Sequence, residues 1–319
     1  MELEQFFDGK VECSFEFRNL MMNKHAYLII AHNNWNILKL LIKALDREEN
    51  DFFVHIDAKV KNFDKSQYEN LVKHSKIYFI ERKSVLWADY SQVEVSLDLL
   101  KFSNSKLKYS YYHLLSGVDM PIKSSQYIYD FFEKSKKEYV GIVSKNLYYA
   151  VRRVKYYHYL VKFNSFRNHK SLKGMDRLIE LVQRVFGVNR LRNNDIVICD
   201  GWQWFSITND FCEFILSKSK YIKNTFDYTI APDELVFQTL LYNSKFIENV
   251  AVYGNLLDGT MRYIDWNRGT PYVWGQDNED FKTLINSPYL FARKFDENVN
   301  MDLVNDIYKY VTMENKYEQ

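Results

Sequence analysis

Short apolar runs and amphipathic segments follow one another in the first third of the chain. The apolar runs at His25–His32, Asp51–Ala58 and Lys76–Glu81 have strand length and are bounded by polar residues, a pattern that predicts strands buried on both faces. Between them, Asn34–Leu45 and Ser66–His74 have the spacing of helices. Strand and helix therefore alternate, which predicts βαβ crossovers in a parallel, doubly wound sheet, an α/β fold.

The rest of the chain adds helices and a further strand. The pattern predicts a helix at Ser91–Asn104, an apolar run at Tyr109–Gly117 leading into a turn at Gly117–Pro121, helices at Arg152–Phe163 and Met175–Val188, a strand at Asp195–Thr208, and helices at Asn209–Ile222 and Asp233–Asn243. The tail, Ser287–Val311, predicts an extended piece followed by an amphipathic helix that Asn298 or Asn300 caps.

The chain shows no internal repeat, low-complexity tract or linker-like run, and it has 4 prolines in 319 residues. We therefore expect one compact domain over residues 23–319, in which a half at 23–145 supports a second half at 146–319. Residues 1–22 are expected to form an N-terminal extension outside the fold, because the tandem Met21 and Met22 stand just before the first strand.

Bulk composition excludes several classes of protein. Lys and Arg number 43 against 41 Asp and Glu, so a net charge of +2 gives no argument for nucleic acid or an anionic membrane. The 3 cysteines, Cys13, Cys199 and Cys212, are odd in number and form no CxxC, which argues against a disulfide framework or a zinc knuckle. The start of the sequence has no signal-peptide pattern, and no apolar run is long enough to span a membrane. These features predict a cytoplasmic protein.

Polar residues follow the predicted strands at the edge of the sheet where open α/β folds bind ligands. No GxGxxG or GxxxxGK[ST] follows a strand, which argues against a dinucleotide site or a P-loop, and neither HExxH nor Asp-x-Asp occurs. If the chain cleaves a phosphate-linked donor, cationic side chains must offset the charge of the leaving group. Arg293 and Lys294, after an apolar extended segment, are the candidates, and a solvated surface pair is the alternative.

A carboxylate pair stands in the stretch Pro232-Asp233-Glu234. Proline in a first helical turn and acidic residues near a helix N-terminus predict a helix start, with Leu235, Leu240 and Leu241 facing a core. The alternative is that Glu234 acts as a catalytic base.

The order of motifs resembles that of a known family. The segments "AYLIIAHN", "FFVHIDAK", "VLWADYSQVEVSLDLL", "YYHLLSGVDMPIKS", "GWQWFSIT", "APDELVFQTLL", "MRYIDW" and "SPYLFARKF" together resemble glycosyltransferase family 14. This family holds the core-2/I-branching β-1,6-N-acetylglucosaminyltransferases and the protein O-xylosyltransferases, and the resemblance runs from about Lys24 to Val311.

The resemblance implies a GT-A-like fold, a UDP-sugar donor, inversion at the anomeric carbon, and no required metal or cofactor. Glu234 matches the general base, Arg293 and Lys294 look like the diphosphate clamp, and Asp119 resembles the acid that holds donor sugar hydroxyls. The remaining donor contacts implied are His32, His55 and Asp57 near the nucleoside, Arg262 as a recurrent arginine, and Arg268 as the nearest candidate for a further phosphate-binding arginine.

The sugar and acceptor pocket implied by the resemblance contains Trp87, Trp202, Gln203, Trp204 and Asp233. The family often has a small or acidic residue where Trp202 and Gln203 stand, so the acceptor stays open. Read without the resemblance, the tryptophans are core residues and Asp119 organises a turn.

The expected function is transfer of GlcNAc, with xylose as the alternative, to a glycan hydroxyl in a bacterial surface polysaccharide or lipooligosaccharide. The bacterial origin is expected because the chain lacks the anchor and disulfides of the animal enzymes. The stretch Arg152–Phe163 is read as a solvated helix face or as a contact for anionic lipid-linked acceptors at the inner membrane surface. A non-catalytic carbohydrate-binding protein and a nucleic-acid-binding protein are the rival classes, and the oligomeric state stays open.

Overall fold

The computed structural model describes residues 24–192 and 194–317. The predicted extension at residues 1–22, which includes Cys13, therefore lies outside the described residues. The strands are β1 His25–Ala31, β2 Asn50–Ile56, β3 Lys76–Phe79, β4 Tyr111–Ser116, β5 Met120–Pro121, β6 Tyr139–Lys145, β7 Cys199–Thr208, β8 Arg262–Ile264 and β9 Phe291–Arg293. The α-helices are α2 Trp35–Ala44, α3 Ser91–Lys106, α4 Ser125–Ser135, α5 Tyr148–Lys155, α6 Lys170–Val185, α7 Asn209–Ser217, α8 Ser219–Phe226, α9 Val236–Tyr242, α10 Leu256–Thr260, α11 Asp280–Ile285 and α12 Met301–Tyr317. Short 3₁₀ turns lie at η1 Lys65–Tyr68, η2 Tyr159–Lys162, η3 Pro232–Glu234 and η4 Lys245–Asn249.

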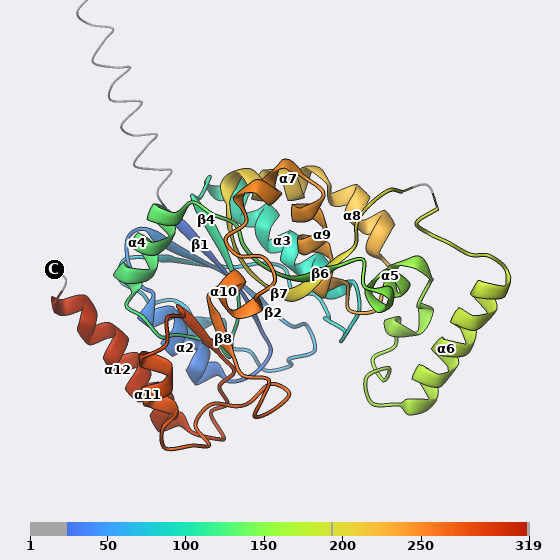
Figure 1. The fold of residues 1–319 in the computed structure, drawn as a ribbon. Coiled ribbons are helices and arrows are strands. Elements are labelled where there is room, and N and C mark those ends of the chain that lie inside the picture. Colours follow the sequence, from blue (N-terminus) through green and yellow to red (C-terminus); the bar gives the residue numbers. More distant parts are fainter. Residues whose placement is uncertain (1–23, 193, 318–319) are drawn as a thin grey trace, which may run out of the picture.

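A six-stranded mixed sheet in the order β3-β2-β1-β4-β7-β6 forms the centre of the molecule (Figure 1). β3, β2, β1 and β4 are parallel, whereas β7 pairs antiparallel with β4 and β6 antiparallel with β7. Every residue of β2 and β4 is buried, as the uninterrupted apolar runs predicted. The predicted doubly wound, mostly parallel α/β sheet is confirmed.

Helices cover both faces of this sheet, so the molecule has two apolar cores. On one face, α2, α4 and α12 pack on the side chains of Tyr27 and Ile29. On the other face, α3, α7, α8 and α9 pack on Ala26 and Leu28. Adjacent residues of β1 thus face opposite cores, as the pleat of a strand requires.

A second, three-stranded sheet in the order β5-β9-β8 joins the C-terminal part of the chain to the turn after β4. β9 pairs antiparallel with β5, and Met120 lies opposite Ala292. The N–H of Phe295 donates to the carbonyl of Val118 at 3.0 Å. This pairing fixes the segment around Arg293 beside the segment around Asp119.

Two predicted helices are wrong in extent. Ser66–His74 is not a helix beyond η1, because the Asp46 carboxylate accepts the N–H groups of Lys73 and His74 at 2.7 and 3.1 Å and holds the chain in a loop. The helix predicted over Arg152–Phe163 ends at Lys155, where Tyr156 is extended.

Other predicted elements differ at their boundaries. The strand predicted from Asp195 begins at Cys199, and the helix predicted over Asn209–Ile222 is split into α7 and α8 at Lys218. The sequence patterns gave no prediction for α4, β6, α10 or α11. The predicted cap of the last helix is confirmed, because the Asn300 Oδ1 accepts the N–H of Leu303 at 2.9 Å. Within the described residues, no helix has the length and apolar character needed to cross a membrane.

Candidate functional site

A cleft of about 380 Å³ opens at the carboxyl ends of β1, β2 and β4, the edge at which the sequence placed a ligand site. Its walls combine residues from both halves of the chain. The lining residues are Ile30, Ala31, His32, Asp57, Lys59, Val85, Leu86, Trp87, Gln92, Ser116, Asn164, Arg167, Asn168, Gln203, Trp204 and Arg293.

Arg293 is the best-anchored cation of this cleft. Its Nη1 donates to the Asp119 Oδ1 at 3.1 Å, and its guanidinium lies 4.0 Å from the centroid of the Trp204 ring. The side chain is 17% exposed, so most of the guanidinium is out of bulk water. Burial lowers the pKa of Arg293 and the neighbouring Asp119 opposes that shift, but an arginine at the end of β9 keeps its charge.

Asp119 both shapes the turn after β4 and holds Arg293. Its Oδ2 accepts the N–H of Ser116 at 2.8 Å, while its Oδ1 faces the guanidinium. Burial raises the pKa of Asp119 and the Arg293 charge opposes this. At the same turn, a Cβ on Gly117 would lie 2.6 Å from the Ala31 Cβ, so only glycine lets the turn approach β1 this closely. The local reading of Asp119 as a turn residue thus agrees with the structure, alongside its pairing with Arg293.

His32 and Asp57 lie where β1 and β2 end, as predicted, and both line the cleft. The Asp57 Oδ1 accepts the N–H of Lys59 at 2.8 Å, and the Lys59 ammonium lies 3.4 Å from Oδ2. Burial lowers the pKa of His32, with Asp57 opposing the shift, so the ring tends to be neutral. His32, Asp57 and Lys59 also border a second hollow of about 580 Å³ that extends toward Glu297.

Aromatic and amide side chains form the opposite wall. Gln203 and Trp204 reach the cleft from β7, and Trp87 reaches it from the loop before α3. Trp87 is 47% exposed, and the Arg167 guanidinium and Lys173 ammonium lie 5.7 and 5.6 Å from its ring centroid. These predicted pocket residues therefore do come together, and Trp87 and Trp204 are not fully buried core residues.

The acidic pair lies next to the cleft, outside its lining. The N–H of Ala231 donates to the carbonyl of Ala88 at 2.8 Å, which ties η3 to the loop that carries Trp87. The Glu234 carboxylate is 48% exposed and receives the Arg153 Nη2 at 3.0 Å. Asp233 is buried, and one of its oxygens has no hydrogen-bond partner among the described residues. Burial, together with the neighbouring Glu234 charge, raises the pKa of Asp233 to about 7.

The structure does not bring His55, Trp202 or Arg262 to the cleft lining. The buried His55 Nε2 accepts the N–H of Lys83 at 2.9 Å, and burial lowers its pKa to about 4. The Arg262 guanidinium lies inside the molecule and donates to the carbonyls of Leu114 and Phe205 at 3.2 and 2.6 Å. In this geometry Arg262 joins the central sheet to the small sheet.

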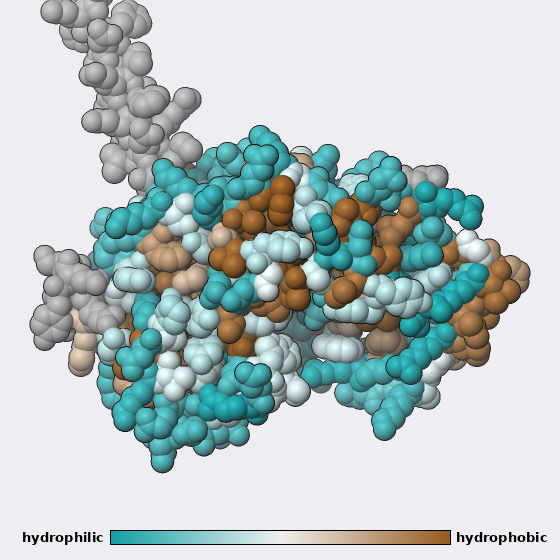
Figure 2. Space-filling view, viewed as in Figure 1, coloured by the Kyte–Doolittle hydropathy of each residue, from teal (hydrophilic) through white to brown (hydrophobic). Residues whose placement is uncertain are grey.

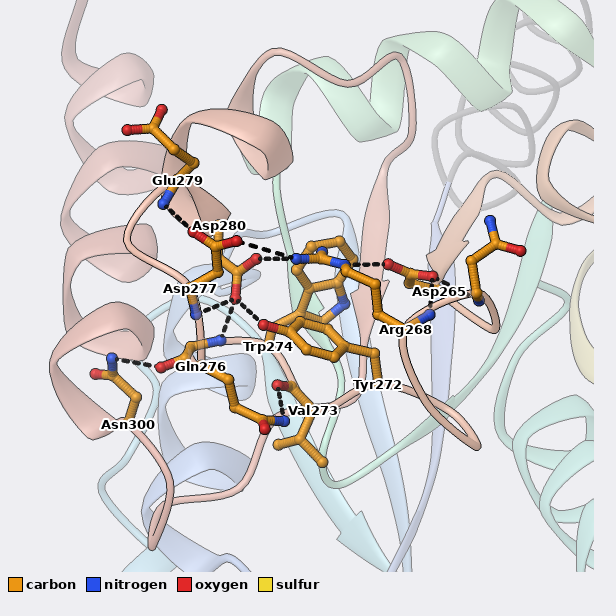
Figure 3. Close-up of polar contacts among 12 residues, drawn as sticks. Asp265, Arg268, Tyr272, Val273, Trp274, Gln276, Asp277, Glu279, Asp280 and Asn300 are labelled. Atoms are coloured by element: carbon orange, nitrogen blue, oxygen red, sulfur yellow. Dashed lines mark hydrogen bonds and ion pairs between the residues drawn. The ribbon is translucent and has the colours of Figure 1, made fainter.

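Arg268 also lies away from the cleft lining, in the loop between β8 and α11 (Figure 3). Its guanidinium donates to Asp265 at 2.6 Å and to the buried Asp280 at 3.0 Å, and it stacks 3.9 Å from the Tyr272 centroid. The loop reaches the site through Trp274, whose Nε1 donates to the Arg293 carbonyl at 3.0 Å. Arg268 therefore supports the segment that carries the predicted clamp.

Lys294 is half-buried and does not line the cleft. Its carbonyl accepts the N–H of Trp274 at 3.0 Å. Within the described part of the chain, its ammonium makes no hydrogen bond or ion pair.

Two cations of the cleft were not among the predicted site residues. Lys59 stands two residues after Asp57 in the quoted segment "FFVHIDAK", so position after a strand was a usable signal for it. Arg167 lies between η2 and α6 in a stretch without periodicity, and no sequence signal pointed to it.

The arrangement suits an anionic, hydroxyl-rich ligand. Arg293, Lys59 and Arg167 supply positive charge, and the tryptophans supply faces for a base or a sugar. No group of three or more His, Cys, Asp or Glu side chains suited to a metal ion occurs among residues 24–192 and 194–317.

Known proteins resemble this chain over most of its length. The family model described as Core-2/I-Branching enzyme matches residues 25–284. Xylosyltransferase 2 of Rattus norvegicus is 25% identical over 308 residues, covering 88% of this chain and 32% of that protein. The N-acetyllactosaminide beta-1,6-N-acetylglucosaminyl-transferase of Homo sapiens is 26% identical over 301 residues, covering 86% of this chain and 68% of that protein.

The chain thus spans about a third of the first relative's length and about two thirds of the second's. Among solved structures, mouse Xyloside xylosyltransferase 1 in its apo form overlaps 87% of this chain and 99% of that one, with a TM-score of 0.37 and 10% identity. An overlap at this level carries no argument about function.

Proposed function

Because the chain belongs to the Core-2/I-Branching enzyme family, we propose that it is an inverting glycosyltransferase that moves a sugar from a UDP-sugar to a glycan hydroxyl. The observation that carries the proposal is Arg293, a largely buried cation paired with Asp119 and stacked on Trp204 in a cleft at the carboxyl ends of the parallel strands. A guanidinium there offers two parallel N–H donors to a phosphate.

The reaction needs a base and a leaving-group clamp on opposite sides of the anomeric carbon. In the proposed step, the acceptor oxygen forms a bond to that carbon, the bond between the carbon and the diphosphate oxygen breaks, and UDP leaves with the bonding electrons. The proton of the acceptor hydroxyl passes to the Glu234 carboxylate. Arg293 and Lys294 offset the charge that develops on the diphosphate, with no metal required.

Two contacts support the assignment of Glu234 as the base. The bond between Ala231 and Ala88 keeps η3 beside the loop that places Trp87 in the cleft. The Arg153 guanidinium, 3.0 Å from the Glu234 carboxylate, fixes the side chain while leaving it 48% exposed and accessible to an acceptor.

For the donor sugar we propose GlcNAc, with xylose as the alternative. One of the two relatives is named as an N-acetylglucosaminyl-transferase and the other as a xylosyltransferase. The acceptor is proposed to be a glycan hydroxyl of a bacterial surface polysaccharide or lipooligosaccharide. Gln203 and Trp204, which line the cleft, are the residues proposed to contact the donor sugar and its neighbour. Asp119 is buried and outside the cleft lining, and it is proposed to act through Arg293.

A donor panel assayed in EDTA tests the function. The chain should hydrolyse or transfer from one UDP-sugar, and that UDP-sugar should also raise its thermal midpoint. Turnover with UDP-GlcNAc and none with UDP-xylose would assign the donor. Binding of sugar without turnover of any UDP-sugar would instead indicate a non-catalytic carbohydrate-binding protein, and turnover that EDTA abolishes would contradict the metal-independent mechanism.

A further inference from the structure

Helix α6 packs on the rest of the molecule through its polar side. Asp176, Glu180 and Gln183, on successive turns, are all buried. The His158 Nδ1 lies 2.7 Å from the Asp176 carboxylate, and the Glu180 carboxylate pairs with Arg152. This is the reverse of an ordinary surface helix, which turns its apolar stripe to the core.

The outer face of α6 is apolar and points to solvent. Exposure reaches 60% at Leu178, 54% at Leu181, 78% at Val185 and 80% at Phe186, the residue after the helix. Figure 2 shows hydrophobic residues along the edge of the molecule where Figure 1 places α6. The residues of this outer face are Met175, Leu178, Leu181, Val182, Val185 and Phe186. A contiguous apolar surface of this kind marks a contact with another hydrophobic phase or molecule.

The charges around the outer face have one sign. In the whole stretch Phe163–Arg192 the acidic residues are Asp176 and Glu180, both buried, with Asp176 in contact with His158 and Glu180 paired with Arg152. Lys170 and Arg177 are exposed on α6 itself. A second copy of the helix laid against this face would bring like charges together, whereas an anionic surface would meet opposite ones.

An aromatic side chain with a polar tip borders the same face. The Tyr148 ring is 72% exposed, and its hydroxyl accepts the Arg184 Nη2 at 2.9 Å, beside the C-terminal end of α6. An apolar face with flanking lysine and arginine and an amphipathic aromatic residue is the composition of helices that lie in the plane of a bilayer interface.

We propose that the outer face of α6 docks the protein on an anionic lipid bilayer, with Leu178, Leu181, Val185 and Phe186 in the acyl boundary and Lys170 and Arg177 at the headgroups. This surface differs from the one expected from Arg152 and Arg153, whose guanidiniums are already paired with Glu180 and Glu234. Because Arg167 and Asn168, just before α6, line the cleft, docking would hold the cleft close to the membrane surface. The proposal does not depend on sugar transfer.

Vesicle flotation of the full chain tests the docking. The protein should float with phosphatidylcholine vesicles that contain phosphatidylglycerol, bind phosphatidylcholine alone more weakly, and be released by high salt. Leu178→Glu and Val185→Glu should each weaken partitioning about tenfold or more. Each replaces an aliphatic side chain that would enter the acyl boundary by a carboxylate. Met313→Glu introduces the same carboxylate at a 57% exposed apolar site on α12, at the far end of the molecule (Figure 1), and should leave partitioning unchanged.

Insertion has its own readout. Lipids brominated in the acyl chain should quench the tryptophan fluorescence of Phe186→Trp more strongly than that of the parent protein. Absence of binding to anionic vesicles at low salt, equal binding by Leu178→Glu with an unchanged thermal midpoint, or no added quenching would overturn the proposal. A lipid-free dimer that Leu178→Glu converts to a monomer would assign the face to self-association instead and would also overturn it.

Discussion

Arg293 and Asp119 are 174 positions apart in the chain, yet the Arg293 Nη1 lies 3.1 Å from the Asp119 Oδ1. The pairing of β9 with β5 creates this contact, because β5 follows Asp119 directly and β9 ends at Arg293. A buried carboxylate thus orients a guanidinium that lines the cleft. The contact joins the two segments that the proposed donor site requires.

Replacement of Arg293 by lysine should weaken UDP binding. Lysine keeps the charge but loses the bidentate fork and the stack on Trp204, so we expect affinity to fall about tenfold to a hundredfold, measured by isothermal titration calorimetry. Arg177→Lys, at an exposed position of α6, is the matched control and should bind UDP normally. An unchanged dissociation constant in a folded Arg293→Lys would remove Arg293 from the donor site.

Lys294 is tested separately, since it does not line the cleft. Its ammonium has no intramolecular ion pair within the described residues, so Lys294→Ala should weaken UDP binding with little change in stability if the side chain turns to the diphosphate. Lys282→Ala, at an exposed lysine of α11, should change neither. If UDP affinity survives in Lys294→Ala, the clamp consists of Arg293 without its neighbour.

Glu234→Gln should separate binding from chemistry. A glutamine keeps the shape of the side chain but cannot accept the acceptor proton, so the transfer rate should fall about 10²–10⁴-fold while UDP binding stays the same. The control is Glu248→Gln, at an exposed glutamate of η4. Near-normal turnover of Glu234→Gln would show that another group takes the proton.

Asp233→Asn should raise stability in a pH-dependent way. Burial raises the Asp233 pKa from 3.8 to about 7, so the folded state holds this proton more tightly than the unfolded state. The stability contributed by the protonated carboxyl is fully present below pH 4 and is lost as the pH rises through 7. The variant should therefore exceed the parent by up to about 4 kcal/mol in unfolding free energy at pH 8, and by little at pH 4.

Urea unfolding at the two pH values measures this difference. Asp195→Asn, at an exposed carboxylate, serves as the control and should match the parent at both. Equal stabilities of Asp233→Asn and the parent at pH 8 would show that Asp233 is not held in an apolar setting.

Arg268→Met should mainly lower the free energy of unfolding. It removes the three ion pairs to Asp265, Asp277 and Asp280. The buried Asp280 carboxylate keeps the Tyr272 hydroxyl and the N–H groups of Gly275 and Asp277 as donors. Because the Arg268 side chain is 37% exposed and partly screened, we expect a loss of about 1–2 kcal/mol. Lys282→Met, which removes an exposed pair with Glu279, is the control and should leave the free energy of unfolding nearly unchanged.

The UDP affinity of Arg268→Met distinguishes support from direct contact. Its loss should be smaller than that of Arg293→Lys, since Arg268 reaches the cleft through Trp274 and the Arg293 carbonyl. A loss as large as that of Arg293→Lys, with full stability, would instead indicate that Arg268 itself binds phosphate.

The sequence by itself determined the parallel part of the central sheet and the family. Uninterrupted apolar runs such as β1 and β2 are local signals, because a strand between two layers of helices must be apolar on both faces. Polar residues after those strands predicted where His32 and Asp57 would line a cleft. The order of the motifs indicated the family that the match over residues 25–284 confirms.

Only the tertiary structure decided which polar side chains meet. The sequence gives no local signal that distinguishes the environments of Arg262, Arg268 and Arg293. In the structure, Arg262 donates to buried carbonyls, Arg268 pairs with Asp280 within a loop, and Arg293 lines the cleft. The orientation of α6 could not be predicted either, because its amphipathic pattern allows either side of the helix to face the protein. The contacts of Asp176 with His158 and of Glu180 with Arg152 turn the polar side inward. Periodicity records which residues share a face, but the partner of that face comes from contacts between distant segments.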